Sequence, residues 1–184
     1  MTHLLRQQPS PFTESKDNMA TTYEKIATTT LGTASATITF STIPATYTDL
    51  RVVLIGTTGS PDDPEITFNG DNSGAGTNYS RTALGGSGTS ATSTRDTNLP
   101  YIVNYLTNFS STTVSYQSFD IFSYTGSTFK TVLCDGSADR NGSGGVGRTV
   151  GLWRNTASIT SIRLNANSTY LTGTTATLYG ILKA

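Results

Sequence analysis

The segment Thr37-Ile38-Thr39-Phe40-Ser41 alternates polar and apolar residues at every position, and Glu65-Ile66-Thr67-Phe68-Asn69 does the same. Successive side chains of a β-strand point to opposite faces of a sheet, so such segments have one apolar and one polar face. Each segment therefore predicts a strand with one face on a core and one face toward water. Leu50-Arg51-Val52-Val53-Leu54-Ile55 is more apolar, and we expect a strand whose two faces are both covered.

Similar segments, rich in β-branched and aromatic residues, recur along the rest of the chain. They lie at residues 101–106, 114–124, 129–134, 150–153, 159–164 and 175–182. Clusters of Gly, Asn, Asp, Ser and Pro separate them, and Asn69-Gly70 and Asn141-Gly142 favour tight turns. No stretch has the apolar spacing of an amphipathic helix. We expect about nine or ten short strands, almost no helix and an all-β fold, a jelly-roll-like two-sheet β-sandwich.

Two segments differ from this pattern. Residues 84–98 (LGGSGTSATSTRDTN) are low in complexity, and we expect a long surface loop there. Residues 1–18 contain the only histidine, His3, and two prolines, and they show no alternation. We expect an extended N-terminal arm or an incidental leader over residues 1–22, and one β-sandwich domain over residues 23–184.

The charge distribution argues against two classes of partner. The chain has 12 basic and 12 acidic residues, a net charge of zero, and only 13% of its residues are charged. Nucleic-acid binders normally carry a basic stripe, whereas Lys and Arg are scattered here. The longest apolar stretch, Val52-Val53-Leu54-Ile55, is far shorter than the ~20 residues of a membrane-spanning helix. We expect no nucleic-acid partner and no membrane insertion, and the N-terminus has no secretory signal pattern.

The chemistry available to the chain is narrow. With one His and one Cys, the sequence offers neither a Ser-His-Asp or Cys-His catalytic set on the body of the chain nor a zinc ligand set. Cys134 lies in a predicted strand and is expected to be a small core residue rather than a reactive thiol. We predict that the chain is not an enzyme, and that it has no catalytic, cofactor-binding or metal-binding residues.

Two motifs could suggest otherwise. The glycine-rich segment Asn141–Arg148 resembles a phosphate-binding loop but has no Lys-Ser/Thr ending and no βαβ setting, so we expect a flexible connection between strands. Acidic and amide residues flank one predicted strand, and their oxygens could hold Ca²⁺. Their spacing fits no EF-hand, so we expect them to form turns and to be solvated at the surface. That group comprises Asp62, Asp63, Glu65, Asp71 and Asn72. Pairs of carboxylates could also hydrolyse glycosides, yet nothing in the sequence selects a pair.

Aromatic residues are the remaining candidates, because flat rings with a polar group suit sugar and protein surfaces. We expect most of them to be sheet residues that fill the sandwich. The set comprises Tyr23, Tyr47, Tyr79, Tyr101, Tyr105, Tyr116, Tyr124, Tyr170, Tyr179 and Trp153. Sequons at Asn78, Asn108, Asn141 and Asn167 carry little weight in a chain so rich in Ser and Thr.

The segment from Ala36 to Val53, ATITFSTIPATYTDLRVV, resembles a recurring segment of virion proteins from tailed bacteriophages, notably aquatic and cyanobacterial phages. Ile66–Asp71 followed by Thr77–Ser80 is similar to the next segment of that family, and Ala176–Ile181 resembles its usual ending. The resemblance covers about residues 20–184. It implies a virion structural protein of the capsid-decoration or tail-fibre-like kind and assigns no active-site residue.

Two functional hypotheses follow. The first is a capsid decoration (cement) protein on the outer surface of the virion, made in the host cytoplasm. It would be a homotrimer that binds the major capsid protein or other virion proteins and stabilises the shell, with its arm along neighbouring coat subunits. The alternative is a tail or head fibre tip that binds a host-surface glycan through tyrosine-bearing loops and residues 85–98. A glycan-processing enzyme is a distant third reading.

Overall fold

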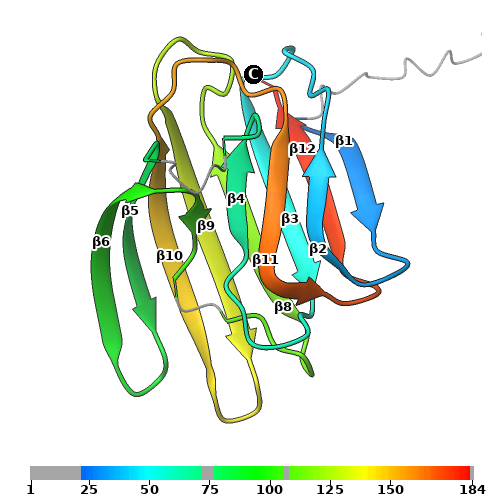
Figure 1. The fold of residues 1–184 in the computed structure, drawn as a ribbon, viewed down its shortest axis with the longest axis vertical. Coiled ribbons are helices and arrows are strands. Elements are labelled where there is room, and N and C mark those ends of the chain that lie inside the picture. The colour runs from blue at the N-terminus through cyan, green and yellow to red at the C-terminus, as the bar shows by residue number, and fades with distance from the viewer. Residues whose placement is uncertain (1–21, 72–76, 106–107, 183–184) are drawn as a thin grey trace, which may run out of the picture.

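The structure is a computed structural model that describes residues 22–71, 77–105 and 108–182, and these contain twelve strands and no helix (Figure 1). The strands are β1 (Tyr23–Thr30), β2 (Ser35–Phe40), β3 (Asp49–Gly56), β4 (Glu65–Phe68), β5 (Tyr79–Gly86), β6 (Ala91–Leu99), β7 (Ile102–Val103), β8 (Ser115–Ile121), β9 (Lys130–Asp139), β10 (Gly144–Trp153), β11 (Ile162–Tyr170) and β12 (Thr175–Ile181). The predicted arm, with His3, lies outside the described residues.

The strands form two antiparallel sheets that pack against each other. One sheet has eight strands in the order β1-β12-β3-β8-β9-β10-β5-β6, and the other has four in the order β2-β11-β4-β7 (Figure 1). If the β5–β6 and β9–β10 hairpins are set aside, four strands remain in each sheet. Each of these eight strands is followed along the chain by a strand of the other sheet, except that β4 and β7 belong to the same sheet. Antiparallel sheets joined in this way are a jelly roll, so the predicted fold class is confirmed.

Several predicted strands are confirmed, but the described residues contain twelve strands rather than nine or ten. Three local predictions are also wrong: those for residues 84–98, for the covered faces of residues 50–55, and for the water-facing side of residues 65–69, because β4 is buried on both faces. Residues 84–98 are not a loop: they fall within the β5–β6 hairpin, whose turn is closed by a hydrogen bond from the Ser87 amide to the Ser90 carbonyl. Strand β6 lies at the edge of the sheet and is exposed along most of its length, so no apolar alternation marks it in the sequence. Strand β3 is covered on one face only, because Arg51, Val53 and Ile55 point away from the core.

The glycine-rich segment connects two strands, as expected, but the connection is shorter than predicted. The turn of the β9–β10 hairpin is closed by a hydrogen bond from the Arg140 amide to the Ser143 carbonyl, and β10 begins at Gly144. Asn141 and Gly142 both have positive φ values, 58° and 101°, which suit the turn dipeptide Asn-Gly. Most of the predicted glycine-rich loop is therefore strand.

The core contains a cluster of aromatic rings between the sheets. The ring centroids of Phe68 and Trp153 are 5.4 Å apart, and those of Tyr79 and Trp153 are 6.4 Å apart. The indole nitrogen of Trp153 donates to Asp71 Oδ2 at 2.7 Å, so the buried polar group has a partner. Cys134 is fully buried and burial raises the pKa of its thiol, which confirms that it is a core residue.

The close approach of β12 to Tyr47 gives a test of the packing. A Cβ atom at Gly180 would overlap the ring of Tyr47, whereas nothing lies within 4 Å of a Cβ at Gly32. We expect Gly180→Ala to lower the free energy of unfolding by about 1–3 kcal/mol, because overpacking displaces the ring. Gly32→Ala is the matched control and should be neutral or slightly stabilising. Urea denaturation of both variants measures the difference, and equal stabilities would contradict the packing described.

Candidate interaction face and polar cleft

The eight-stranded sheet has one side on the core and one side toward solvent. On β3 the inward residues Leu50, Val52 and Leu54 are fully buried, and the residues between them point outward. Because strand register fixes which residues share a side, the outward side chains line up across the sheet. We call this solvent-facing side the outer face.

Three rows of register partners cross all eight strands of the outer face. The first is Thr30, Thr175, Ile55, Tyr116, Ser137, Val146, Gly86 and Ala91. The second is Thr28, Thr177, Val53, Ser118, Asp135, Arg148, Leu84 and Ser93. The third is Lys25, Tyr179, Arg51, Asp120, Leu133, Val150, Thr82 and Arg95. Hydroxyl groups dominate on β1 and β12, whereas aliphatic, hydroxyl and charged groups are mixed from β3 to β5.

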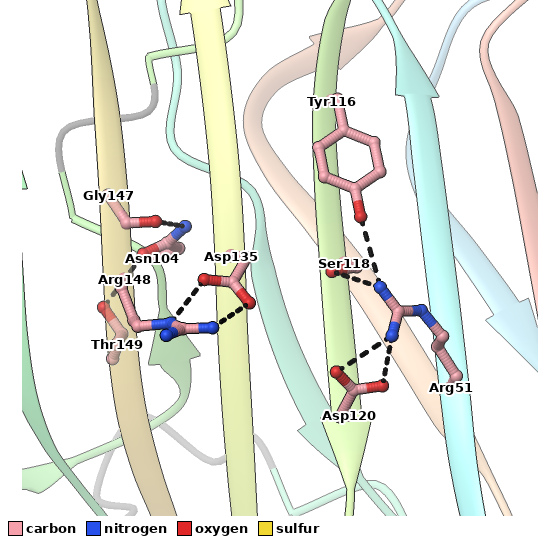
Figure 2. A network of polar contacts seen from close by, with 9 residues as sticks. All are labelled: Arg51, Asn104, Tyr116, Ser118, Asp120, Asp135, Gly147, Arg148 and Thr149. Carbon is pink, nitrogen blue, oxygen red and sulfur yellow. Dashed lines mark hydrogen bonds and ion pairs between the residues drawn. The ribbon is translucent and has the colours of Figure 1, made fainter.

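Figure 2 shows two ion pairs at the centre of the outer face. Arg51 Nη1 on β3 lies 3.1 Å from Asp120 Oδ1 on β8, and Arg51 Nη2 donates to the Tyr116 hydroxyl at 3.4 Å. Arg148 on β10 binds both oxygens of Asp135 on β9, at 2.7 and 3.1 Å. Each pair consists of residues directly opposite each other on neighbouring strands. The centre of the face therefore carries no net charge.

The pKa of Asp120 is shifted by its surroundings. Burial raises the pKa of Asp120, the neighbouring charge of Arg51 opposes the rise, and the negative charge of Asp135 adds to it. The exposed pair Arg148–Asp135 contributes little to stability, because solvent screens it. Each pair holds its donors and acceptors in fixed positions on the outer face.

Aliphatic side chains project between these charges. Ile55, Leu84, Val146 and Val150 are 45%, 60%, 62% and 46% exposed, respectively, and all four belong to the three rows. A groove of about 590 Å³ crosses the strands from Tyr116 to Ala91, and Leu84, Val146 and Arg148 line it. Exposed apolar groups collected on one face, with polar groups around them, are typical of a protein contact surface.

The inner side of β10 is held in place beneath this groove. Asn104, which is fully buried, donates through Nδ2 to the Gly147 carbonyl and accepts from the Thr149 hydroxyl, both at 3.0 Å (Figure 2). A Cβ at Gly147 would overlap the Tyr105 carbonyl, so only glycine allows this approach. These contacts fix the strand that carries Val146, Arg148 and Val150.

A second concave site, the polar cleft, lies where β4 and β7 meet the inner side of β5. Its volume is about 320 Å³, and the lining residues include Asp62, Asp63, Glu65, Arg81, Tyr101, Tyr105, Asn108 and Asn167. Glu65 accepts hydrogen bonds from Asn165 at 3.0 Å and from Asn167 at 3.2 Å. Burial nevertheless raises the pKa of Glu65, and the carboxylate of Asp62 adds to the effect.

The opposite wall of the cleft is formed by Arg81. Its Nε donates to Asp96 Oδ2 at 2.8 Å, and its Nη1 donates to the Val103 carbonyl at 3.3 Å. The guanidinium group lies over the ring of Tyr105, 5.4 Å from the ring centroid. The cleft thus places hydrogen-bond donors, acceptors and aromatic rings around one small volume.

The structure brings together only part of the acidic group considered as a calcium site. Asp62, Asp63 and Glu65 line the cleft, but Asp71 binds the Trp153 indole and Asn78 instead, and Asn72 lies outside the described residues. Among residues 22–71, 77–105 and 108–182, no three His, Cys, Asp or Glu side chains are arranged to hold a metal ion. The same ranges contain no helix that is long and apolar enough to cross a membrane.

Most of the aromatic set was expected in the core, but only four of its ten residues are buried there. Tyr79, Tyr124, Tyr170 and Trp153 are fully buried, which removes Trp153 from any sugar-binding role. Tyr101 and Tyr105 reach the cleft and Tyr116 the groove. The aliphatic part of the outer face was not predicted. Val146 and Leu84 lie within segments interpreted as loops, so their shared side could not be recognised.

The shifted pKa of Glu65 predicts a pH effect. The native state binds the proton of Glu65 more readily than the unfolded chain does. Protonation therefore stabilises the fold as pH falls through the native pKa, and the gain levels off below the ordinary value of 4.5. In Glu65→Gln this contribution should be lost. Urea denaturation of both proteins from pH 7 to pH 4, about the range of carboxyl titration, compares them, and parallel pH profiles would contradict the prediction.

The chemistry of the two sites differs. The outer face suits contact with a protein surface, because it combines exposed aliphatic groups with paired charges. The polar cleft suits a small hydroxylated ligand, because hydrogen-bond donors, acceptors and two aromatic rings line one small volume. In comparisons with models of protein families, with curated proteins and with solved structures, nothing matches the chain.

Proposed function

We propose that the chain is a structural protein of a tailed-phage virion, and that it acts as a capsid decoration protein on the outer surface of the shell. The observation that carries the proposal is the outer face, where Ile55, Leu84, Val146 and Val150 are exposed on one broad sheet. Such a surface is expected on a protein that works by contact with other proteins. The resemblance of residues 20–184 to virion proteins supports the choice of assembly.

The proposed mechanism is mechanical. A rigid jelly roll adds buried area across the seams between coat subunits, and many weak contacts become strong when they are repeated over a shell. The partner is the major capsid protein or another virion protein. Residues 1–22 would act as an arm along neighbouring coat subunits, and a homotrimer remains the sequence-based prediction. The protein would be made in the host cytoplasm and carried on the virion, and the proposal assigns it no catalytic step or cofactor.

Binding to shells that lack the protein tests this proposal. We expect the purified full chain to saturate such shells at hundreds of copies per particle, and to raise the temperature at which they rupture. A ligand that binds only the intact shell stabilises it by mass action. Quantitative mass spectrometry of virions gives the natural copy number. A few tens of copies or fewer, with no change in rupture temperature, would exclude decoration.

The polar cleft favours a second candidate, a tail or head fibre tip that binds a neutral host-surface glycan. Sugar hydroxyls both donate and accept hydrogen bonds, which matches the carboxylates of Asp62 and Glu65, the amide of Asn167 and the guanidinium of Arg81. Tyr101 and Tyr105 provide rings beside these groups. The cleft replaces residues 85–98 as the proposed glycan contact, because those residues form strands.

A glycan array separates the two candidates. If the fibre-tip function holds, the chain should bind a defined set of neutral glycans, and Tyr105→Ala should weaken that binding by about 30-fold, as for loss of an aromatic anchor. Tyr179→Ala, on the outer face, is the matched control and should bind normally. Absence of binding by the full chain, or equal losses in both variants, would remove the glycan-binding role.

A further inference from the structure

We propose that the outer face pairs with the same face of a second copy of this chain, so that the assembling unit is a two-fold dimer. The inference rests on the proposed function: two copies pair through the outer face first, and the dimer then contacts the coat subunits through the surfaces that the pairing leaves free. Four exposed aliphatic side chains lie on this face, and those at Leu84 and Val146 are about three-fifths exposed. A second copy would remove them from water together.

The size and shape of the face suit this partner. Eight strands about 4.8 Å apart, each seven to ten residues long, give a projected area of roughly 1,000 Å². A stable interface buries about 800 Å² on each partner. Two sheets with the same right-handed twist can pack face to face at about 30° with their side chains interdigitating. A second copy supplies a sheet of identical twist.

The charges of the face also allow self-association. Arg51 with Asp120 and Arg148 with Asp135 are paired within each copy, so the centres of two faces can meet without juxtaposing net charge. The other charged residues of the three rows, Lys25 and Arg95, lie on the edge strands, where solvent screens them. Only 13% of the chain's residues are charged, and its net charge is zero.

Pairing through the sheet edges is less favourable than pairing through the face. Strand β1 has a bulge between Lys25 and Ala27, and β6 carries the charged residues Arg95 and Asp96. Bulges and charged side chains on edge strands are common means of preventing edge-to-edge pairing. Association by strand addition is therefore disfavoured at both ends of the eight-stranded sheet.

The groove indicates how the two copies are oriented relative to each other. Gly86 and Ala91 form its small-residue end, and Ile55 projects from β3 in the same row. A two-fold axis that lies over β9 in the plane of contact, about 15° from the strand direction, gives a crossing angle of about 30°. It exchanges the positions of β3 and β5, and so brings Ile55 of each copy near Gly86 of the other. A face that meets itself gives a dimer, whereas a closed trimer requires a head-to-tail contact between two different surfaces.

The mass of the full chain in solution tests the inference. Analytical ultracentrifugation over a concentration series should show a monomer–dimer equilibrium. Val146→Asp and Ile55→Asp each place two like charges in a two-fold interface, and should raise the dissociation constant by about 100-fold or more. Thr39→Asp adds the same charge to the exposed side of β2, on the other sheet, and should leave the equilibrium unchanged. Thermal unfolding of each variant verifies that it folds.

Different failures have different meanings. A wild-type chain that stays monomeric at every concentration, or forms a trimer that Val146→Asp does not disturb, would overturn the face-to-face dimer. If that monomer or trimer still binds and stabilises shells, the decoration function stands without the dimer. A dimer that Val146→Asp dissociates, but that binds no shells, would support the pairing and reject decoration.

Discussion

One constraint decides which side of the eight-stranded sheet each side chain occupies. Alternate residues of every strand must be buried, and the pairing register aligns the buried residues of neighbouring strands. Leu50, Val52 and Leu54 must lie on the core, and a shift of one residue would expose all of them to water. The same parity then places Arg51 opposite Asp120 on the solvent side, and the next strands place Arg148 opposite Asp135. The paired charges are thus a consequence of how the core is buried.

The two added hairpins account for most of the proposed functional surface. Strands β5, β6, β9 and β10 widen a four-stranded jelly-roll sheet to eight strands (Figure 1). On their outer side they carry Leu84, Val146 and Val150, and on their inner side Arg81 reaches the carbonyl of Val103. The hairpins therefore carry three of the four exposed aliphatic residues of the outer face, and they contribute Arg81 to the polar cleft, whose other lining residues lie elsewhere in the chain.

The chemistry of the two sites indicates which side of the molecule another protein would cover. Covering the outer face with a protein is favourable, because it removes exposed aliphatic groups from water. Covering the cleft is unfavourable unless new hydrogen bonds form, because its acidic and amide groups lose their hydration. A copy whose eight-stranded sheet is covered by another protein chain would keep the cleft accessible to solvent. The two proposed roles can therefore be separated by experiment, because different residues carry them.

The amino-acid sequence was sufficient to predict the all-β class, the jelly roll and the buried position of Cys134, because strict alternation and turn dipeptides are local signals. It failed at β6 and at the start of β10, where Thr, Ser and Gly carry no apolar alternation because the edge strand is hydrated and glycine has no side chain. Only the tertiary structure decided that Ile55, Val146 and Leu84 share a face, and that Glu65 and Arg81 share a cleft. Both outcomes depend on pairing between strands far apart in the sequence, which no local pattern encodes.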